Sequence, residues 1–415
     1  MPERPFHYAW VIIAAGVVNL FACLGLGRFA LGMLLPSMRQ GLSLSYAELG
    51  LIGTGNFVGY LAGVVICGTL VRRLGARRVI FFGLLAVGSS MLLVSLMDHY
   101  LAILACYLVT GIGSGLANVA MMGLVAPWFA PRWRGRAAGL MVAGNGLGIM
   151  LSGTLIPLLA AQEGGVGWRH GWWWMGSLVL VSALLCGALL RNDPAALRLS
   201  PLGSRPTADY GPASLATATE APLRWTLIAH LGAIYLLFGF TYVIYATFIV
   251  TTLVQELGYS QAAAGTLWVW VGFFSLFSGP VFGGLSDRLG RRWGMLLVFA
   301  LQTGAYLLVG SRLTGGWIYL SIALFGLVVW SIPSILTAAV SDYLPRQKVT
   351  TALGQITLCF GLGQVCGPAV AGLLAETSGS FASSYLLAAA LTATAMVLTL
   401  GLRPALPSPA AAPLG

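Results

Sequence analysis

The sequence predicts an all-α membrane protein with twelve transmembrane helices arranged as two pseudo-symmetric six-helix halves. Three observations predict this fold: the composition, the recurring apolar segments and an internal repeat. The chain is 58% hydrophobic and only 8% charged, whereas soluble domains carry roughly 25% charged residues. So few polar side chains cannot cover a folded surface in water, and most of this chain must therefore face lipid.

Apolar segments of about 20 residues or more recur along the chain, each long enough to cross roughly 30 Å of hydrocarbon as a helix. A transmembrane barrel would instead show alternating segments of about ten residues. The first segment has no cleavage site and exceeds signal-peptide length, so we expect it to be the first helix. The expected spans are 9–36, 46–71, 78–97, 100–127, 136–160, 171–190, 225–254, 261–286, 293–311, 316–341, 349–375 and 382–402.

The sequence also repeats at an offset of 215 residues. The matching positions are mostly glycines, and they pair as Ser45/Ser260, Gly50/Gly265, Gly68/Gly283, Arg73-Leu74-Gly75/Arg288-Leu289-Gly290, Arg77/Arg292, Gly111/Gly326, Gly139/Gly354, Gly146/Gly361 and Gly148/Gly363. A register kept over a hundred residues indicates a duplicated unit of six helices, a pattern typical of secondary transporters. The predicted halves are 1–190 and 225–402.

Two polar segments interrupt the apolar pattern. Residues 191–224 are rich in Pro, Ser, Thr and Ala, and we expect them to form a flexible cytoplasmic linker because they bury too little apolar surface to fold. Residues 403–415 are expected to form a disordered cytoplasmic tail.

The net charge of +11 would suggest a nucleic-acid partner in a soluble chain, but its distribution favours a membrane topology. The basic residues gather in alternate connections and in the 191–224 segment, whereas the other connections hold only Arg39, Arg169 and Arg312. This asymmetry follows the positive-inside rule and predicts that both termini face the cytoplasm. We expect a monomer in the bacterial cytoplasmic membrane, with the lipid bilayer but no nucleic acid as a partner.

The sequence predicts no cofactor, no metal and no enzymatic activity. The six cysteines lie inside predicted spans without metal-ligand spacing, and we expect them to be free and inert. No intramembrane protease pattern of Ser-His, paired Asp or His-Glu-x-x-His occurs within the spans.

Residues 283–292, Gly-Gly-Leu-Ser-Asp-Arg-Leu-Gly-Arg-Arg, lie between two predicted spans of the second half. They resemble the signature loop of the major facilitator superfamily. The resemblance covers nearly the whole chain and implies that superfamily's fold and transport function. The first-half copy, residues 68–77, departs from the pattern because Arg72 stands where the superfamily has Asp.

Further segments are similar to subgroups of that superfamily. Gly25-Leu26-Gly27-Arg28-Phe29 and Gly239-Phe240-Thr241-Tyr242 resemble the bacterial YbfB/YjiJ-type group. Residues 128–139 and Gly167-Trp168-Arg169 also resemble monocarboxylate-type members. None of these similarities names a substrate.

Arg28 is the only charged residue well inside a predicted span, 18 residues after Trp10, or roughly 27 Å along a helix. A guanidinium at that depth costs at least about 2.5 kcal/mol, so it should face a wet cavity or a partner. We expect it to bind a carboxylate or phosphate of a small-molecule substrate. The alternatives are that it reaches the outer headgroups or pairs with Glu48.

The remaining substrate-binding candidates are polar or aromatic residues of the four spans that the resemblance places around a central cavity, together with one residue of the eleventh span. Interhelical hydrogen bonding or plain packing is the alternative role for each of them. They are Ser114, Asn118, Tyr235, Tyr242, Tyr245, Trp330, Ser331 and Gln355.

All eleven acidic residues lie in loops or near helix ends. Antiport generally needs a buried carboxylate, so the sequence favours uniport or proton co-transport of an organic anion, most of all a monocarboxylate. Efflux of an amphiphilic neutral or cationic compound remains the alternative, since Gly367-Pro368 resembles an antiporter pattern. A non-transporting membrane sensor is the alternative of another class.

The resemblance also implies a cytoplasmic gate. Asp287 should cap the start of the fifth span, near Arg134 or Arg136, whereas Arg72 would be unfavourable at the equivalent helix start. The other gating candidates are Arg288, Arg291 and Arg292. Small residues at spacing four, Gly144-Gly148-Ser152 and Gly363-Gly367-Ala371, are expected to pack closely at the seam between the halves.

Overall fold

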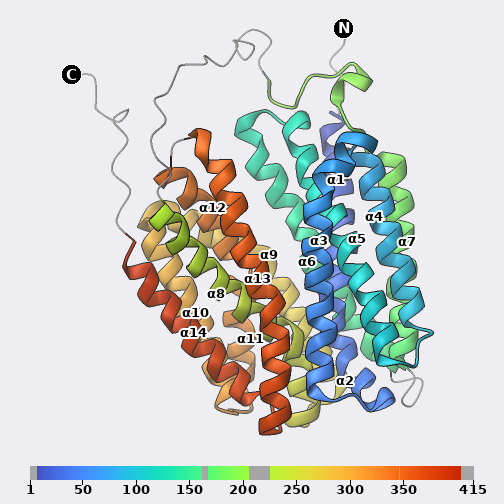
Figure 1. Ribbon diagram of the computed structural model, residues 1–415, viewed down its shortest axis with the longest axis vertical. Coiled ribbons are helices and arrows are strands. Elements are labelled where there is room, and N and C mark those ends of the chain that lie inside the picture. Colours follow the sequence, from blue (N-terminus) through green and yellow to red (C-terminus); the bar gives the residue numbers. More distant parts are fainter. Residues whose placement is uncertain (1–6, 161–166, 205–224, 345, 403–415) are drawn as a thin grey trace.

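The computed structural model describes residues 7–160, 167–204, 225–344 and 346–402. These residues form an antiparallel bundle of helices (Figure 1), of which twelve are long and apolar enough to cross a membrane. All twelve predicted spans are confirmed, with bounds that differ from the prediction by a few residues. The predictions for residues 205–224 and 403–415 lie outside the described residues.

The first half contains six spans. The first is built from three successive helical segments, α1 (Ala9–Leu20), the π-helical η1 (Phe21–Phe29) and α2 (Ala30–Leu42). The other five are α3 (Tyr46–Leu74), α4 (Ala76–Val94), α5 (Tyr100–Trp128), α6 (Pro131–Ala160) and α7 (Gly167–Leu189).

The second half repeats this order. Its first span is α8 (Trp225–Thr251) followed by η3 (Thr252–Glu256), and its fourth is divided into α11 (Gly316–Val328) and α12 (Ser331–Tyr343). The others are α9 (Gln261–Leu289), α10 (Arg291–Gly310), α13 (Arg346–Ser378) and α14 (Ala382–Leu400).

The division of the tenth span was not predicted, and Pro333 explains it. A proline lacks the amide that would bond to the carbonyl four residues earlier, Val329, and its ring clashes there. The helix therefore stops at Val328 and restarts at Ser331. The Trp330 amide, left without a helical partner, donates to the Ser278 hydroxyl of α9 at 2.9 Å. This bond satisfies the amide inside the protein, where no water is needed.

Close glycine contacts within each half follow the 215-residue repeat. A Cβ on Gly148 would lie 2.5 Å from Cα of Gly25, and one on Gly363 would lie 2.8 Å from the amide nitrogen of Phe240. Adding 215 to Gly148 and Gly25 gives Gly363 and Phe240, so the two halves repeat the same contact between helices. The prediction that these glycines lie at the seam between the halves is wrong. They let α6 approach the first span and α13 approach α8.

The seam between the halves is formed by α3 against α13 and by α6 against α9. At the end where α3 begins, a Cβ on Gly50 would overlap the Pro368 carbonyl, and one on Gly153 would lie 2.7 Å from the Gly265 carbonyl. At the opposite end, a Cβ on Gly139 would meet nothing within 4 Å. The halves therefore touch at one end and diverge at the other, which we call the outer and inner ends after the predicted topology.

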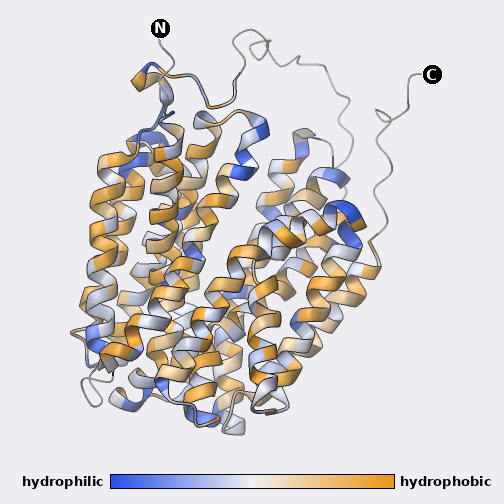
Figure 2. Cartoon of the chain, turned by 180° about the vertical axis from the view of Figure 1, so that it is seen from behind, coloured by the Kyte–Doolittle hydropathy of each residue, from blue (hydrophilic) through white to orange (hydrophobic). Residues whose placement is uncertain are grey.

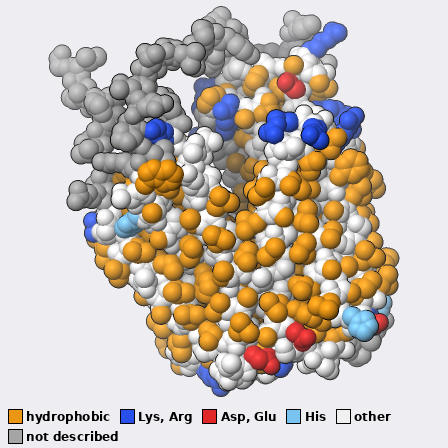
Figure 3. All heavy atoms as spheres, in the orientation of Figure 1, with side chains coloured by type: hydrophobic (Ala, Val, Ile, Leu, Met, Phe, Trp, Pro, Cys, Tyr) orange, Lys and Arg blue, Asp and Glu red, His pale blue; other side chains and the backbone are white. Residues whose placement is uncertain are grey.

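The surface matches a membrane setting. Hydrophobic residues cover the sides of the bundle while hydrophilic ones gather at the helix ends (Figure 2). Lys and Arg side chains form a band near the end where the described chain starts (Figure 3). Together with the twelve apolar spans, this distribution makes the chain a multi-pass membrane protein.

The start of the predicted linker is folded, which corrects the expectation for residues 191–204. Pro194–Leu197 forms a 3₁₀ turn capped by Asp193, because a proline is favourable at the first helical position. The indole of Trp128 donates to the Arg191 carbonyl at 2.9 Å, and the Leu202 amide donates to the Trp128 carbonyl at 2.9 Å. This stretch packs against the inner end of the first half.

Candidate functional site: a buried arginine between the halves

A π-helical segment in the first span holds Arg28. Its wider turns leave carbonyl groups without regular α-helical partners, and α5 satisfies two of them. The Ser114 hydroxyl donates to the Cys23 carbonyl at 2.6 Å, and the Tyr107 hydroxyl donates to the Arg28 carbonyl at 3.1 Å. Helix α5 therefore fixes the backbone on both sides of the arginine's turn.

The Arg28 side chain is only 8% exposed, so it does not reach the headgroups. Its Nε donates to Asn56 Oδ1 at 3.3 Å, and its guanidinium carbon lies 4.6 Å and 4.2 Å from the ring centres of Phe57 and Tyr60. The predicted alternative partner, Glu48, caps α3 through the Ser45 amide instead. Aromatic faces of α3 thus stabilise the cation without neutralising it.

The guanidinium keeps unused hydrogen-bonding capacity. Its Nη2 is buried and has no acceptor, and no ion pair joins Arg28 to an acidic side chain anywhere in the described ranges. Buried donors without partners are costly, and this Nη2 can still donate a hydrogen bond to an acceptor. The cavity beside it measures about 10 Å³ and is lined by residues of the first span, α3, α5 and α8. That is roughly the space of one water molecule.

The second half contributes an aromatic wall opposite Arg28. The Tyr242 side chain lies near the guanidinium, accepts a hydrogen bond from Gln364 of α13 and packs edge-on against Trp330 at 5.9 Å between ring centres. Trp330 in turn contacts Phe29 of the first half at 5.3 Å. Its indole Nε1 is a second buried donor without a partner. Helices from both halves therefore meet around one anion-compatible centre.

Several candidates lie at this centre's edge or away from it. Tyr235 stacks on Phe360 at 4.3 Å, and Asn118 donates to the Tyr60 hydroxyl at 2.7 Å, one layer behind Arg28. Gln355 is half-buried on α13 with Oε1 unpartnered. These three can join a site only through their neighbours or after a rearrangement.

Three other candidates have hydroxyls committed to interhelical bonds. Ser114 holds the π-helical turn, as described above. Tyr245 points away from Tyr242, bonding Ser321 at 2.8 Å and stacking on Phe325 at 4.0 Å. Ser331 bonds the Ser278 hydroxyl at 2.8 Å. Tyr245 therefore does not share the face of Tyr242, because three residues along a helix turn the side chain some 60° away.

Three neighbours of Arg28 in the structure, Asn56, Tyr60 and Tyr107, were not predicted from the sequence. Asn56 could have been noticed as a lone amide within an apolar span, since polar residues there usually have a partner. Nothing in the spacing of the two tyrosines would have separated them from packing residues.

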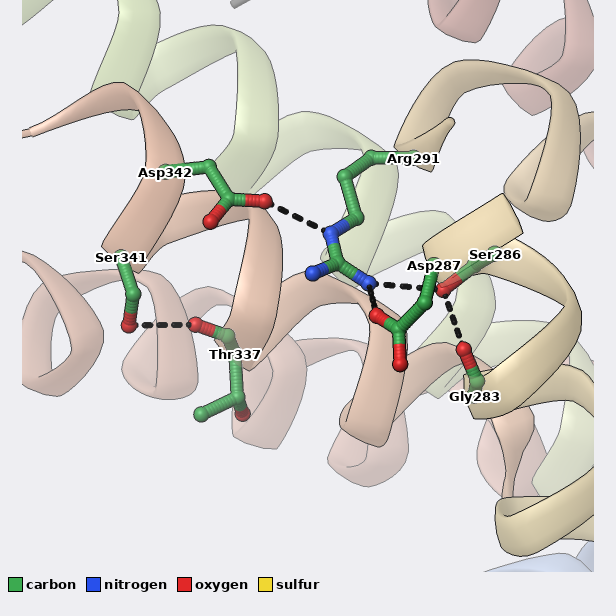
Figure 4. A network of polar contacts seen from close by, with 7 residues as sticks. All are labelled: Gly283, Ser286, Asp287, Arg291, Thr337, Ser341 and Asp342. Carbon is green, nitrogen blue, oxygen red and sulfur yellow. Dashed lines mark hydrogen bonds and ion pairs between the residues drawn. The ribbon is translucent and has the colours of Figure 1, made fainter. Parts of the chain in front are cut away.

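At the inner end, Asp287 does not reach Arg134 or Arg136. It pairs with Arg291, whose Nε also donates to Asp342 at 2.7 Å (Figure 4). Arg134 donates to the Phe129 carbonyl at 3.1 Å, and Arg72 donates to Thr69 at 3.3 Å. In this conformation each half keeps its own inner polar contacts, and the predicted latch between halves is open.

A latch does join the halves at the outer end. The Glu376 carboxylate of α13 accepts from the Tyr46 amide at 2.8 Å and from the Ala47 amide at 3.3 Å. Arg39 donates to Gln255 at 2.8 Å, and Gln255 donates to the Pro36 carbonyl at 3.1 Å. A carboxylate at the start of α3 is stabilised by the helix dipole. We call Glu376, Arg39 and Gln255 the outer latch, because their contacts join the two halves at the outer end, whereas the halves diverge at the inner end.

Two repeated six-helix halves with a central polar site define the chain as a secondary transporter of the major facilitator type. A family model described as "Uncharacterised MFS-type transporter YbfB" matches residues 20–400, and the chain belongs to that family. Its resemblance to the superfamily and the predicted fold are thereby confirmed.

Curated relatives span nearly the whole chain. The hexuronate transporter of Bacillus subtilis (strain 168) is 24% identical over 96% of this chain and 95% of its own. The 3-(3-hydroxy-phenyl)propionate transporter of Escherichia coli (strain K12) is 25% identical over 89% of each chain. Human monocarboxylate transporter 11 is 27% identical over 97% of this chain and 84% of its own.

Solved structures support the fold. A D-xylose-proton symporter superposes with a TM-score of 0.73, at 17% identity, over 96% of this chain and 99% of its own. A bacterial homologue of the human lysosomal transporter Spinster, in an inward-facing and unoccupied conformation, gives a TM-score of 0.68 at 15% identity over 96% and 95% of the two chains.

Proposed function

We propose that this chain is an alternating-access carrier of a small organic anion, most of all a monocarboxylate, and that Arg28 binds the substrate's carboxylate. The observation that carries the proposal is the buried Arg28 Nη2 without an acceptor. A planar guanidinium can bind a carboxylate in a bidentate manner, donating one hydrogen bond to each oxygen. The Trp330 Nε1, also unpartnered and adjacent to Tyr242, supplies a second donor from the other half.

Several of the relatives support an acidic substrate. Their names refer to hexuronate, 3-(3-hydroxy-phenyl)propionate, sulfoacetate and monocarboxylates. All are organic acids or their anions, and a permanently charged arginine is suited to each of them. We propose the same substrate class for this chain, in the bacterial cytoplasmic membrane with both termini in the cytoplasm, acting as a monomer.

The proposed coupling is uniport or proton co-transport. The acidic side chains that the structure describes in the spans lie near helix ends, where they cap helices or pair with arginines. None of them therefore faces Arg28 as a proton-exchanging partner. A proton carried with the anion would then travel on the substrate itself or on a residue exposed in another conformation.

A thermal-shift panel of carboxylates on purified protein tests the proposal. At least one carboxylate should stabilise the wild type, Arg28→Lys should retain part of the shift because the charge remains, and Arg28→Gln should lose it. Lipophilic cations serve as the comparison series. Stabilisation by cations alone, unchanged in Arg28→Gln, would contradict an anion site and favour efflux.

Efflux of an amphiphilic compound remains the second candidate because of the aromatic wall. Tyr235, Phe238, Tyr242 and Phe360 stack with ring planes within 8–14° of one another. A 132-residue segment is also 35% identical to multidrug resistance protein MdtG of Escherichia fergusonii, over 32% of that protein. The cation arm of the panel decides between the two functions.

A further inference from the structure

A hollow of about 780 Å³ lies at the inner end of the first half, away from Arg28. It is bounded by the start of α4, the end of α7 and the first linker residues, and its walls include Arg77, Arg78, Phe81, Phe82, Leu184 and Asn192. Two walls face outward, because Phe82 is 55% and Leu184 is 62% exposed. In a membrane these side chains face lipid, so the hollow opens toward the bilayer rather than toward the central cavity.

The basic residues around this hollow have no acidic partner. Arg72, Arg73, Arg77 and Arg78 form no ion pair within the part of the chain that the structure describes. In the second half the equivalent loop has acidic partners, because Arg291 pairs with both Asp287 and Asp342. Arg72 occupies the position equivalent to Asp287, so the first half has a cation where the second has an anion. Of these four arginines, Arg77 and Arg78 line the hollow and therefore remain available to an outside anion.

The hollow is held in shape by polar contacts. Arg77 Nε donates to the Gly187 carbonyl of α7 at 2.8 Å, and the Arg77 amide donates to Asn192 Oδ1 at 2.8 Å. A Cβ on Gly187 would come within 2.8 Å of the Phe81 ring, so this glycine admits the aromatic wall. These contacts leave the Arg77 Nη groups and the whole Arg78 guanidinium available to an anion, beside an apolar wall.

We propose that this hollow binds an anionic phospholipid of the cytoplasmic leaflet. The phosphodiester contacts Arg77 and Arg78, and an acyl chain lies along Phe82 and Leu184. Basic pockets between transmembrane helices on the cytoplasmic side suit such headgroups. The apolar, outward-facing walls favour a lipid over a free phosphate, which would gain nothing from them.

Native mass spectrometry of the purified protein tests this proposal with phosphatidylglycerol and phosphatidylcholine of identical acyl chains. We expect phosphatidylglycerol to bind preferentially at one site, and Arg78→Gln to weaken it about fivefold, since each basic residue near anionic lipid contributes about that factor. Arg73→Gln is the matched control because it removes the same charge at an exposed residue outside the hollow. The melting temperature without lipid identifies any folding defect.

Equal retention of the two lipids would overturn the proposal. Equal weakening by Arg73→Gln and Arg78→Gln would also overturn it, since the lipid would then respond to net charge alone. Displacement of the lipid by millimolar inorganic phosphate would assign the arginines to a free anion instead. A melting-temperature loss confined to Arg78→Gln would be resolved by Arg78→Lys, which should restore phosphatidylglycerol binding if the charge contacts the headgroup.

Discussion

At the scale of single residues, the surroundings of Arg28 stabilise its charge without neutralising it. Asn56 supplies one neutral acceptor, and the faces of Phe57 and Tyr60 stabilise the cation. A carboxylate in place of the amide would neutralise the guanidinium within the protein. If Arg28 binds an anion as proposed, residue 56 should have to be neutral.

Asn56→Asp should weaken binding of the anion while preserving the fold. The new carboxylate would lie where the amide oxygen is now, 3.3 Å from Arg28 Nε, and would compete with the substrate for the same cation. A loss of affinity of at least tenfold, about 1.4 kcal/mol, is expected in calorimetric titration with a carboxylate identified by the thermal-shift panel. Asn56→Ala should weaken binding less. Full affinity in Asn56→Asp would show that the substrate does not use Arg28.

The sequence predicted which residue carries the charge of the site, but not which residues contact it. Arg28 was predictable because a lone charge within an apolar span needs a compensating environment. The roles of Ser114 and Tyr107 were not, because they depend on the π-helical turn at residues 21–29. An extra residue per turn changes which carbonyls need partners, and no periodicity in this apolar segment indicates it.

At the scale of helices, two sets of glycines have different mechanical roles. Gly148 packs α6 on the first span within one half, whereas Gly50 packs α3 on α13 across the seam. The first contact should persist in every conformation if the halves move as units, while the second exists only when the outer end is closed.

Gly148→Ala should lower the melting temperature, because its Cβ would lie 2.5 Å from the Gly25 backbone and overpacking typically costs about 1–3 kcal/mol. Gly50→Ala should instead change the conformational balance toward an open outer end with a smaller effect on melting. Thermal unfolding of both variants in detergent checks the contrast. Equal destabilisation would mean that the two halves do not separate along this seam.

The spans themselves followed from apolar length, which is why all twelve were predictable. Pro333 disfavours a continuous tenth span, but Pro157, Pro280 and Pro368 lie inside unbroken helices, so predicting the division also required knowing that Ser278 could accept the Trp330 amide. The folded start of the linker required knowing that Trp128 could bind its backbone. Both are contacts between distant segments, so local composition could not reveal them.

At the scale of the whole molecule, the two ends of the seam are in opposite states. The outer latch is formed by Glu376 on the start of α3, while Asp287 at the inner end stays paired within its own half. The resemblance implied that a carboxylate, Asp287, caps a helix of the opposite half at the inner end. In this conformation a different carboxylate, Glu376, caps a helix of the opposite half at the outer end. Alternating access would exchange one latch for the other.

Glu376→Gln should weaken the outer latch and shift the population toward an outward-open state. A helix-terminal carboxylate contributes about 0.3–1 kcal/mol, more when partly buried, so a two- to fivefold change in population is expected. A cysteine introduced at Gly354, where a Cβ meets nothing within 4 Å, in a cysteine-free background should then be labelled more slowly from the cytoplasmic side. Unchanged labelling would leave the Glu376 contact without a gating role.

Asp287→Asn should act in the opposite direction if Asp287 caps α6 when the inner end is closed. Faster labelling of the same cysteine is expected, because the inner-closed state loses its latch. The loss of the ion pair with Arg291 is a separate effect, and Asp342→Asn provides the control because it removes the other partner of Arg291. Equal labelling in the two variants would mean that Asp287 only stabilises its own half and has no gating role.

Counterflow in proteoliposomes measures whether Arg28 binds an organic anion that the protein transports. Vesicles loaded with an unlabelled monocarboxylate that stabilises the purified protein are diluted into the labelled compound, with wild type, Arg28→Lys and Arg28→Gln reconstituted to equal density. Transient accumulation is expected with the wild type, reduced accumulation with Arg28→Lys and none with Arg28→Gln. Accumulation by Arg28→Gln at the wild-type rate would mean that Arg28 does not bind the transported anion.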